Sequence, residues 1–470
     1  MEVRTLTLIK SSSLAEIAKI EGDALTPIAI FQRIQGQKKF LLESSLKHEE
    51  KGRYSFIGAN PYKQVTSMGN EASVHDLETG ENSITKGRVL DILKGLLKEV
   101  ELPEVSLPFF GGAVGYLGYD VIRQYEEIGG VSVDELEMPE AHFMFYRDII
   151  CYDHAEQSVY IVALKTGDEQ KEDLLDRIEE KKKQIRGNSS AEEPMKLEKL
   201  TFTPSISQHR FEQMVNTAKE AIIAGEVFQV VLSQRLMADY HSDPFLIYRK
   251  LRLSNPSPYM FYIDFTDYVV LGSSPESLIK VKNREVITNP IAGTRKRGAT
   301  KEEDMFLETN LLEDEKELAE HKMLVDLGRN DIGRVCEVGS IQIPVYMKIE
   351  RYKYVMHIVS EVSGILRKDV SGLDALAACL PAGTVSGAPK IRAMNLISEL
   401  EDSKRGVYSG AVGYVAFNGD LDFALAIRTM VIKDNTAYVQ AGAGIVYDSV
   451  PETEYEETLN KAKALLEVSG

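Results

Sequence analysis

The sequence of 470 residues contains no tryptophan and only three cysteines, Cys151, Cys336 and Cys379. Because these cysteines are few and far apart, they exclude a disulfide-stabilised scaffold and a cysteine-rich zinc site, and they suit a reducing cytosol. No apolar run approaches the roughly 20 residues that a membrane-spanning helix needs. The first residues also lack a basic stretch followed by a long apolar core, so we expect no signal peptide and a soluble, cytoplasmic protein.

Positive charge is also scarce. Lys and Arg number 55 against 72 Asp and Glu, which gives a formal net charge of −17. Such an excess of negative charge repels nucleic acid and anionic membranes, so we expect neither as a partner. An anionic ligand would therefore need a locally positive pocket. The hydrophobic fraction of 43% is typical of a globular protein with a large core.

Strand and turn signals dominate the N-terminal third of the chain. The stretch 31–45 predicts a strand, a turn at Gly36 and a second strand, and the stretch 148–164 predicts a hairpin. A highly charged helical pattern follows at 168–194 and ends in Gly, Ser and Pro, which is typical of an exposed linker.

We therefore predict an N-terminal region at 1–195, with a linker at about 168–204, and a second domain at 205–466. A long surface loop within one fold is the alternative. Further strands are predicted at 227–238, 259–265, 268–274, 277–287, 410–417, 423–432 and 436–447, and further helices at 207–225, 315–327, 372–380, 390–401 and 452–468. Because the strands do not alternate regularly with helices, the pattern favours an α+β fold with antiparallel sheets.

The helix predicted at 315–327 carries closely spaced polar groups. Glu317, Glu320 and His321 are three or four residues apart, so we expect all three near one face. A solvated acidic face is the commoner explanation of such spacing. Here the apolar flank indicates that part of the helix is buried, and a buried carboxylate needs a partner.

The C-terminal helix repeats this spacing with Glu454, Glu457 and Lys461, directly after a glycine-rich stretch. Backbone amides near Gly442 and Gly444 could bind a carboxylate, while the neighbouring glutamates could bind a cation. Oxygen ligands from two helices suit Mg²⁺, and no His or Cys spacing predicts zinc. A solvated face again remains the plainer alternative.

Several cationic, phenolic or hydroxyl side chains lie in or beside glycine-rich turns: Thr294, Arg295, Lys296, Arg297, Lys390, Tyr408 and Arg428. Such groups suit a carboxylate ligand, because arginine offers a bidentate clamp and glycine lets the backbone approach closely. The stretch 383–390 lacks the spacing of a phosphate-binding loop. His357 lies within an apolar run, where a core histidine is the commoner outcome.

Ten stretches follow one another along the chain: LLES, NPSPYMFYIDF, SSPESL, NPIAGTRKRG, KELAEHKMLVDLGRNDIGRV, YVMHIVSEV, PAGTVSGAPKIRAM, RGVYSGAVGY, IRTMV and QAGAGIVYDSVPETEYEET. Together they resemble the chorismate-utilising enzyme family, and most closely its anthranilate synthase component I branch. The resemblance covers essentially the whole chain. It implies a two-domain α+β fold in which orthogonal antiparallel β-sheets pack together, with helices outside.

The resemblance also implies a reaction. Enzymes of this branch are lyases that convert chorismate and ammonia to anthranilate and pyruvate, the first step of tryptophan biosynthesis. The ammonia comes from glutamine. Because the chain lacks a nucleophile-elbow cysteine with a downstream histidine, we expect a separate glutamine amidotransferase subunit, component II, and a hetero-oligomer.

The matching motifs imply site residues. Glu320 and Glu457 would bind Mg²⁺ with support from Glu317 and Glu454, and the substrate contacts would be Gly293, Thr294, Tyr408, Arg428, Gly442, Ala443, Gly444 and Lys461. The catalytic residues would be Glu276, His357 and Thr294. Glu276 would protonate the departing ring hydroxyl, which requires a carboxyl whose pKa is raised by burial. His357 would assist the later loss of pyruvate.

Two positions distinguish this branch from its siblings. Isochorismate and salicylate synthases carry a water-activating lysine where this chain has Gln229. Aminodeoxychorismate synthases typically carry a lysine in place of Ala292. Aminodeoxychorismate synthase component I and a non-catalytic binding or regulatory homologue remain the alternatives.

Two further stretches match the family's tryptophan-binding motifs. These are LLES at 41–44 and NPSPYM at 255–260, and the implied contacts are Ser44, Pro258, Tyr259 and Met260. We expect tryptophan to bind there and to inhibit by feedback, which requires it to favour the less active conformation. Ordinary strand packing is the alternative explanation of both motifs.

Overall fold

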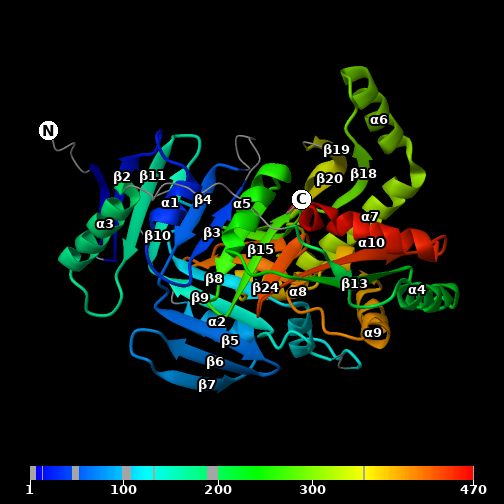
Figure 1. Cartoon of the computed structure of the whole chain (residues 1–470), viewed down its shortest axis with the longest axis horizontal. Coiled ribbons are helices and arrows are strands. Elements are labelled where there is room, and N and C mark those ends of the chain that lie inside the picture. Colours follow the sequence, from blue (N-terminus) through cyan, green and yellow to red (C-terminus); the bar gives the residue numbers. More distant parts are fainter. Residues whose placement is uncertain are drawn as a thin grey trace.

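The computed structural model describes residues 7–12, 14–44, 52–97, 107–130, 133–187, 199–352 and 355–468. Two large sheets of antiparallel strands organise the chain, with helices around them (Figure 1). This arrangement confirms the predicted α+β class with antiparallel sheets.

The first sheet has 13 strands. Its path is β1 (Thr7–Ser12), β2 (Ala15–Glu21), β11 (Ser158–Leu164), β10 (Asp148–Asp153), β4 (Tyr54–Gly58), β3 (Phe40–Glu43), β14 (Tyr259–Asp264), β15 (Tyr268–Ser274), β24 (Thr429–Lys433), β25 (Thr436–Ile445), β13 (Gln229–Asp239) and β12 (Thr203–Pro204), and β21 (Gly387–Ala388) also pairs with β13.

The second sheet has 12 strands. Its path is β18 (Ile291–Lys296), β20 (Val355–Ile365), β17 (Glu285–Thr288), β16 (Ser277–Lys282), β23 (Leu421–Leu425), β22 (Ala411–Ala416), β8 (Gly112–Leu117), β9 (Ala141–Tyr146), β5 (Lys63–Met68), β6 (Glu71–Asp76) and β7 (Asn82–Lys86), and β19 (Gln342–Arg351) also pairs with β20.

The helices pack around these sheets. They are α1 (Pro27–Arg33), α2 (Val89–Leu96), α3 (Lys171–Arg186), α4 (Gln208–Ile223), α5 (Pro244–Ser254), α6 (Lys301–Glu313), α7 (Glu315–Gly333), α8 (Gly372–Cys379), α9 (Lys390–Leu400) and α10 (Pro451–Leu466), with short 3₁₀ turns η1 (Tyr119–Gln124) and η2 (Gly383–Val385). None of the helices in the described ranges is long and apolar enough to cross a membrane.

Strands from both sides of the predicted boundary share each sheet. In the first sheet β3 pairs with β14, and in the second β8 pairs with β22. The boundary near 195–205 is therefore not an edge of either sheet. Residues 188–198 of the predicted linker lie outside the described residues.

A large hydrophobic cluster lies between the two sheets and is rich in aromatic rings. The ring of Phe56 on β4 lies 5.7 Å from that of Tyr414 on β22. Phe109 lies 4.5 Å from Tyr414 and 6.4 Å from Phe40 on β3. Because such ring pairs add to the stabilisation from apolar burial, they fix the two sheets against each other.

The first strand predicted within 31–45 and the single strand predicted at 277–287 are wrong, whereas the second strand within 31–45 is present as β3. The chain at 31–45 begins in helix α1, because the Thr26 side chain caps it by accepting from the Ala29 amide at 3.1 Å and Pro27 suits its first position. The stretch 277–287 is a hairpin, because Asn283 and Arg284 take left-handed φ values of 51° and 70° that turn the chain.

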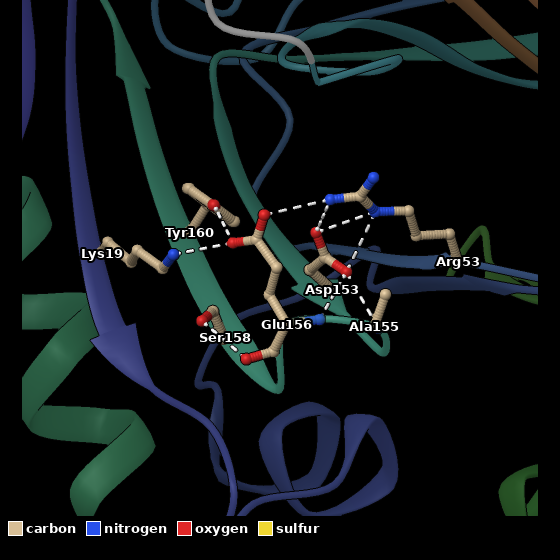
Figure 2. Close-up of polar contacts among 7 residues, drawn as sticks. All are labelled: Lys19, Arg53, Asp153, Ala155, Glu156, Ser158 and Tyr160. Carbon is tan, nitrogen blue, oxygen red and sulfur yellow. Dashed lines mark hydrogen bonds and ion pairs between the residues drawn. The ribbon is translucent and has the colours of Figure 1, made fainter. Parts of the chain in front are cut away.

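A polar network closes the turn between β10 and β11 (Figure 2). The Asp153 carboxylate, whose side chain is 1% exposed, pairs with Arg53 at 2.8 Å and accepts the amides of Ala155 and Glu156. Glu156 pairs with Lys19 at 2.7 Å, and this hydrogen bond lowers the pKa of the Glu156 carboxyl. The network thus joins β2, β10, β11 and the start of β4.

We predict that Asp153→Asn lowers the free energy of unfolding by about 1–3 kcal/mol, because it leaves buried hydrogen-bonding groups poorly paired. Urea unfolding measures this change. Glu71→Gln is the matched control, since it breaks an exposed pair with Lys86 that should contribute about 0.5 kcal/mol or less. Equal losses in the two variants would contradict the prediction.

Candidate active site

The candidate site lies where the chain passes from one sheet to the other. Glu276 follows β15 of the first sheet and precedes β16 of the second, and Arg428 lies between β23 of the second sheet and β24 of the first. The Ser273 amide donates to the Arg428 carbonyl at 3.1 Å, and the Leu425 amide donates to the Glu276 carbonyl at 3.0 Å. These bonds hold the two crossings side by side.

Arg428 interrupts the single strand predicted at 423–432. That prediction is wrong because Arg428 has a left-handed φ of 47°, which ends β23 and starts β24 in another sheet. No hydrogen bond or ion pair joins its half-buried guanidinium to another residue that the structure describes. Burial lowers the pKa of Arg428, and the charge of Glu276 opposes this effect. Such a positive group suits an anionic ligand.

The Glu276 carboxyl is surrounded by protein atoms, although part of the residue remains accessible. Burial raises the pKa of Glu276 to about 7, and the Thr384 hydroxyl, which donates to Oε1 at 2.8 Å, opposes this rise together with Lys461 and Arg428. At neutral pH the group can therefore hold and donate a proton. Sequence reasoning missed Thr384, because in this motif it singled out Lys390.

His357 on β20 faces the bulge of β18. Its Nδ1 lies 3.0 Å from the Gly293 carbonyl oxygen and 3.1 Å from Thr294 Oγ1. Because a carbonyl oxygen can only accept, Nδ1 carries the hydrogen and Nε2 keeps its lone pair. Burial lowers the pKa of His357, which favours this neutral base. Gly293 supplies the left-handed φ of 69° at the bulge.

The glycine-rich end of β25, residues 442–444, forms another side of the candidate site. A Cβ at Gly442 would lie 2.7 Å from the Tyr408 hydroxyl oxygen, and one at Gly444 would lie 2.6 Å from Gln229 Nε2. Both positions therefore need glycine for this close approach. Ala443 between them is fully buried. The structure thus brings together Tyr408, Gln229 and this backbone segment, which are far apart in sequence.

The acidic helices α7 and α10 lie near each other (Figure 1) and act on each other electrostatically. Burial raises the pKa of Glu320, and the charges of Glu317 and Glu457 raise it further. Burial also raises the pKa of Glu454, again with a contribution from Glu457. Lys461 pairs with Glu457 at 2.7 Å and donates to the Gly442 carbonyl at 3.1 Å.

These four glutamates fit a hard cation in their chemistry. They offer only carboxylate oxygens, and their mutual repulsion would be relieved by a divalent ion such as Mg²⁺. Within the described ranges, no three His, Cys, Asp or Glu side chains already form a metal-binding group. Water and substrate oxygens would therefore have to complete the coordination.

Two features of α7 differ from expectation. His321 is fully buried and its Nε2 lies 2.7 Å from Ser360 Oγ on β20, so it packs against the sheet and its Nε2 is occupied. Glu317 is shared with another partner, because Arg295 Nη1 lies 3.1 Å from its Oε1. Glu317 can therefore give a cation at most part of its charge.

Three other candidate cations already have carboxylate partners. Arg295 pairs with Asp314 at 2.7 Å, Lys390 with Asp331 at 2.8 Å, and Arg297 with Asp304 at 2.6 Å. The Arg297 hydrogen bonds lower the pKa of the Asp304 carboxyl to about 2. Because these positive charges are neutralised, they stabilise the structure around the site, and Arg428 is the better anion ligand.

The two motifs predicted to bind tryptophan are neighbours in the first sheet. Met260 of β14 lies opposite Glu43 of β3, and Ser44 directly follows β3. The Tyr259 hydroxyl donates to Asp422 of the second sheet at 3.0 Å. Pro258 is half-buried beside them. The structure therefore brings the four predicted contacts into one region at the interface of the sheets.

The raised pKa of Glu276 predicts a pH-dependent cost. A carboxyl whose folded pKa is about 7 favours folding at low pH, and this contribution is lost as pH rises from the unfolded value of 4.5 through 7. Glu276→Gln should therefore gain about 2–3 kcal/mol of unfolding free energy relative to the wild type between pH 5 and pH 8. Urea unfolding at both pH values tests this, and an equal gain in the exposed variant Glu315→Gln would contradict it.

The chain is similar to known proteins along nearly its whole length. The family model described as chorismate binding enzyme matches residues 37–467. The chain is 47% identical to anthranilate synthase component 1 of Lactococcus lactis, over 97% of this chain and 100% of that protein, and 49% identical to that of Acetivibrio thermocellus, over 95% and 93%.

Solved structures give the same result. The crystal structure of anthranilate synthase component I from Streptococcus pneumoniae superimposes with a TM-score of 0.82 at 44% identity, covering 95% of this chain and 98% of that chain. The menaquinone-specific isochorismate synthase of Escherichia coli shares the fold at 18% identity, with a TM-score of 0.72 over 98% and 97% of the two chains. The chain therefore belongs to the chorismate-binding enzyme family, in its anthranilate synthase component 1 group.

Proposed function

We propose that this chain is the aminase subunit of anthranilate synthase, which converts chorismate and ammonia to anthranilate and pyruvate. One observation carries the proposal. A buried carboxyl with a pKa of about 7, Glu276, lies at one crossing between the sheets. The neighbouring crossing carries Arg428, whose guanidinium has no hydrogen-bond or ion-pair partner among the described residues. A proton donor and an anion ligand are thus held together, as a dianionic substrate with a poor leaving group requires.

Each side chain then has a role in the first step. Arg428 and the backbone of Gly442 and Gly444 bind the enolpyruvyl carboxylate, beside the Tyr408 hydroxyl. Ammonia adds to the ring as the ring hydroxyl departs, and Glu276 supplies the proton with which the hydroxyl leaves as water. Thr384 holds the Glu276 carboxyl in place through its hydrogen bond.

The second step needs a base rather than an acid. The neutral His357 presents Nε2 because Nδ1 is occupied by the Gly293 carbonyl and Thr294. His357 can therefore accept the ring proton that is lost as the aminated intermediate releases pyruvate and becomes aromatic. Burial, which lowers its pKa, keeps His357 in the form that this step uses.

Glu320 and Glu457 would hold Mg²⁺, with support from Glu454 and from Glu317, whose negative charge is shared with Arg295. When bound, the ion would neutralise the ring carboxylate of chorismate and make the conjugated ring a better electrophile. Lys461 lies between Glu457 and the Gly442 carbonyl, so it adds positive field between the two ends of the substrate.

The choice of ammonia as nucleophile rests on Gln229. Its amide lies beside Gly444, and an amide cannot deprotonate water. We further propose a glutamine amidotransferase subunit as the source of ammonia, in a hetero-oligomer. The cysteines Cys151, Cys336 and Cys379 are all buried, which does not suit a glutaminase nucleophile. The relatives' name, component 1, is consistent with a second component.

Feedback inhibition by tryptophan is the last part of the proposal. The segments at Ser44 and Pro258–Met260 meet where the sheets face each other, and Tyr259 joins the sheets through Asp422. β15, which pairs with β14, leads directly to Glu276. A ligand wedged between these segments could therefore shift the catalytic crossing and favour a less active conformation.

The main test is an assay with purified chain, chorismate, Mg²⁺ and ammonium. We expect anthranilate, detected by its fluorescence, and about 100-fold slower turnover in Glu276→Gln, because a general acid is lost. Glu320→Gln should raise the Mg²⁺ concentration required for half-maximal rate, whereas the exposed control Glu315→Gln should not.

Two controls make this assay decisive. Glutamine without ammonium should give no product from the single chain, and product with glutamine alone would contradict the need for a partner. A product that becomes aromatic only after a lyase is added would identify aminodeoxychorismate synthase instead. Full activity in Glu276→Gln would contradict the proposed role of Glu276 as the general acid.

Tryptophan should inhibit the ammonia-dependent reaction. We expect Ser44→Phe to weaken tryptophan binding, measured by calorimetry, and to relieve inhibition while leaving the uninhibited rate near that of the wild type, because Ser44 lies outside the catalytic crossing. Ser83→Phe, a change on the exposed edge strand β7, is the control and should bind tryptophan normally. Unchanged turnover at saturating tryptophan would disprove the regulatory proposal.

A further inference from the structure

Arg405 is a fully buried cation in the loop between α9 and β22. It is 2% exposed, and its charge is balanced by Glu401, whose Oε1 lies 2.6 Å from Arg405 Nη2. Taking such a pair out of water costs free energy, and packed apolar side chains could often replace it without loss of stability. The contacts of Arg405 therefore need an explanation beyond stability.

Those contacts reach three separate segments around the active site. Arg405 Nη1 donates to the Val385 carbonyl at 2.7 Å in η2, and Nη2 donates to the Val231 carbonyl at 2.7 Å in β13. The guanidinium also lies 5.6 Å from the centre of the Tyr408 ring and 4.8 Å from that of Tyr119. One rigid planar group thus touches η2, β13 and the loop that carries Tyr408.

Each contact is one step from a group with a proposed chemical role. Val385 follows Thr384, which donates to the proton donor Glu276. Val231 lies opposite Gly444 in the pairing of β13 with β25. The hydroxyl of Tyr408 reaches Gly442. Arg405 is therefore the common support of the acid and of the backbone segment that binds the carboxylate.

We propose that Arg405 is a positioning residue. It holds the proton donor Glu276 at a fixed distance from the carboxylate-binding segment at Tyr408 and Gly444. The inference rests on the proposed function, and it adds a residue that does not touch the substrate. Arginine suits the task because its planar fork bonds several acceptors at once while its faces stack on rings. The single ammonium of lysine cannot reproduce this arrangement.

Glu401 completes the support. It accepts from Arg405 Nε at 2.8 Å, and its Oε1 also accepts the Ser233 amide at 2.8 Å and the Ser233 hydroxyl at 2.9 Å. Glu401 therefore ties Arg405 to β13 a second time, two residues from Val231. The ion pair and the strand form one unit, so replacement of Arg405 should disturb geometry on both sides of the substrate.

The test is Arg405→Lys, which keeps the charge and loses the fork. We expect kcat for ammonia-dependent anthranilate formation to fall about 100-fold, the effect of a small misplacement of reacting groups. KM for chorismate should rise much less than kcat falls, because Arg428 still binds the carboxylate although the segment at Tyr408 and Gly444 shifts. Arg177→Lys is the matched control: Arg177 donates to Asp148 at 2.8 Å and to the Leu164 carbonyl at 2.6 Å, far from the site.

A second variant separates positioning from folding. In Arg405→Ala, millimolar guanidinium should restore part of kcat by filling the vacated site, and it should have no such effect on Glu276→Gln. If Arg405→Lys keeps the wild-type kcat while Glu276→Gln is inactive, the inference is overturned and the proposed function stands. Parallel losses of kcat and thermal stability in Arg405→Lys and Arg177→Lys would also overturn it. No anthranilate from the wild-type chain would overturn the proposed function and this inference together.

Discussion

The site depends on two chain crossings that are bonded to each other. The first sheet passes to the second at Glu276, the second passes back to the first at Arg428, and two backbone hydrogen bonds hold these passages together. The backbone at such a crossing leaves the hydrogen-bond ladder of one sheet before it joins the other. Its side chains therefore need not alternate between the two faces of a sheet and can face the region between the sheets. The carboxyl of Glu276 and the guanidinium of Arg428 are therefore brought near each other by the topology of the chain.

Electrostatics at this place differ from those of the chain as a whole. The net charge of −17 disfavours an anionic ligand, yet the positive charges of Arg428 and Lys461 act locally on Glu276. The same burial that raises the pKa of Glu276 lowers that of His357, so near neutral pH one can carry a proton and the other can accept one. One low-dielectric environment thus suits both steps of the proposed reaction.

Much of the fold follows from local pattern. Hydrophobic periodicity and spacing predicted α4, α7, α9 and α10 and most strands of the second half, because these signals lie within single elements. Errors arose where a few residues override the pattern. Thr26 and Pro27 start a helix where alternation suggested a strand, and Asn283 and Arg284 turn a predicted strand back on itself.

The sequence by itself determined the residue types and spacings of the acidic helices and the glycine-rich turns, since neighbours along a helix or strand have fixed geometry. The tertiary structure alone decided which charges are available. It neutralised Arg297 with Asp304, left Arg428 without a hydrogen-bond or ion-pair partner in the described part of the chain, and brought Thr384 to Glu276 across 108 residues. Such pairings depend on sheet register and on how the chain crosses between sheets, and no local pattern encodes these distances.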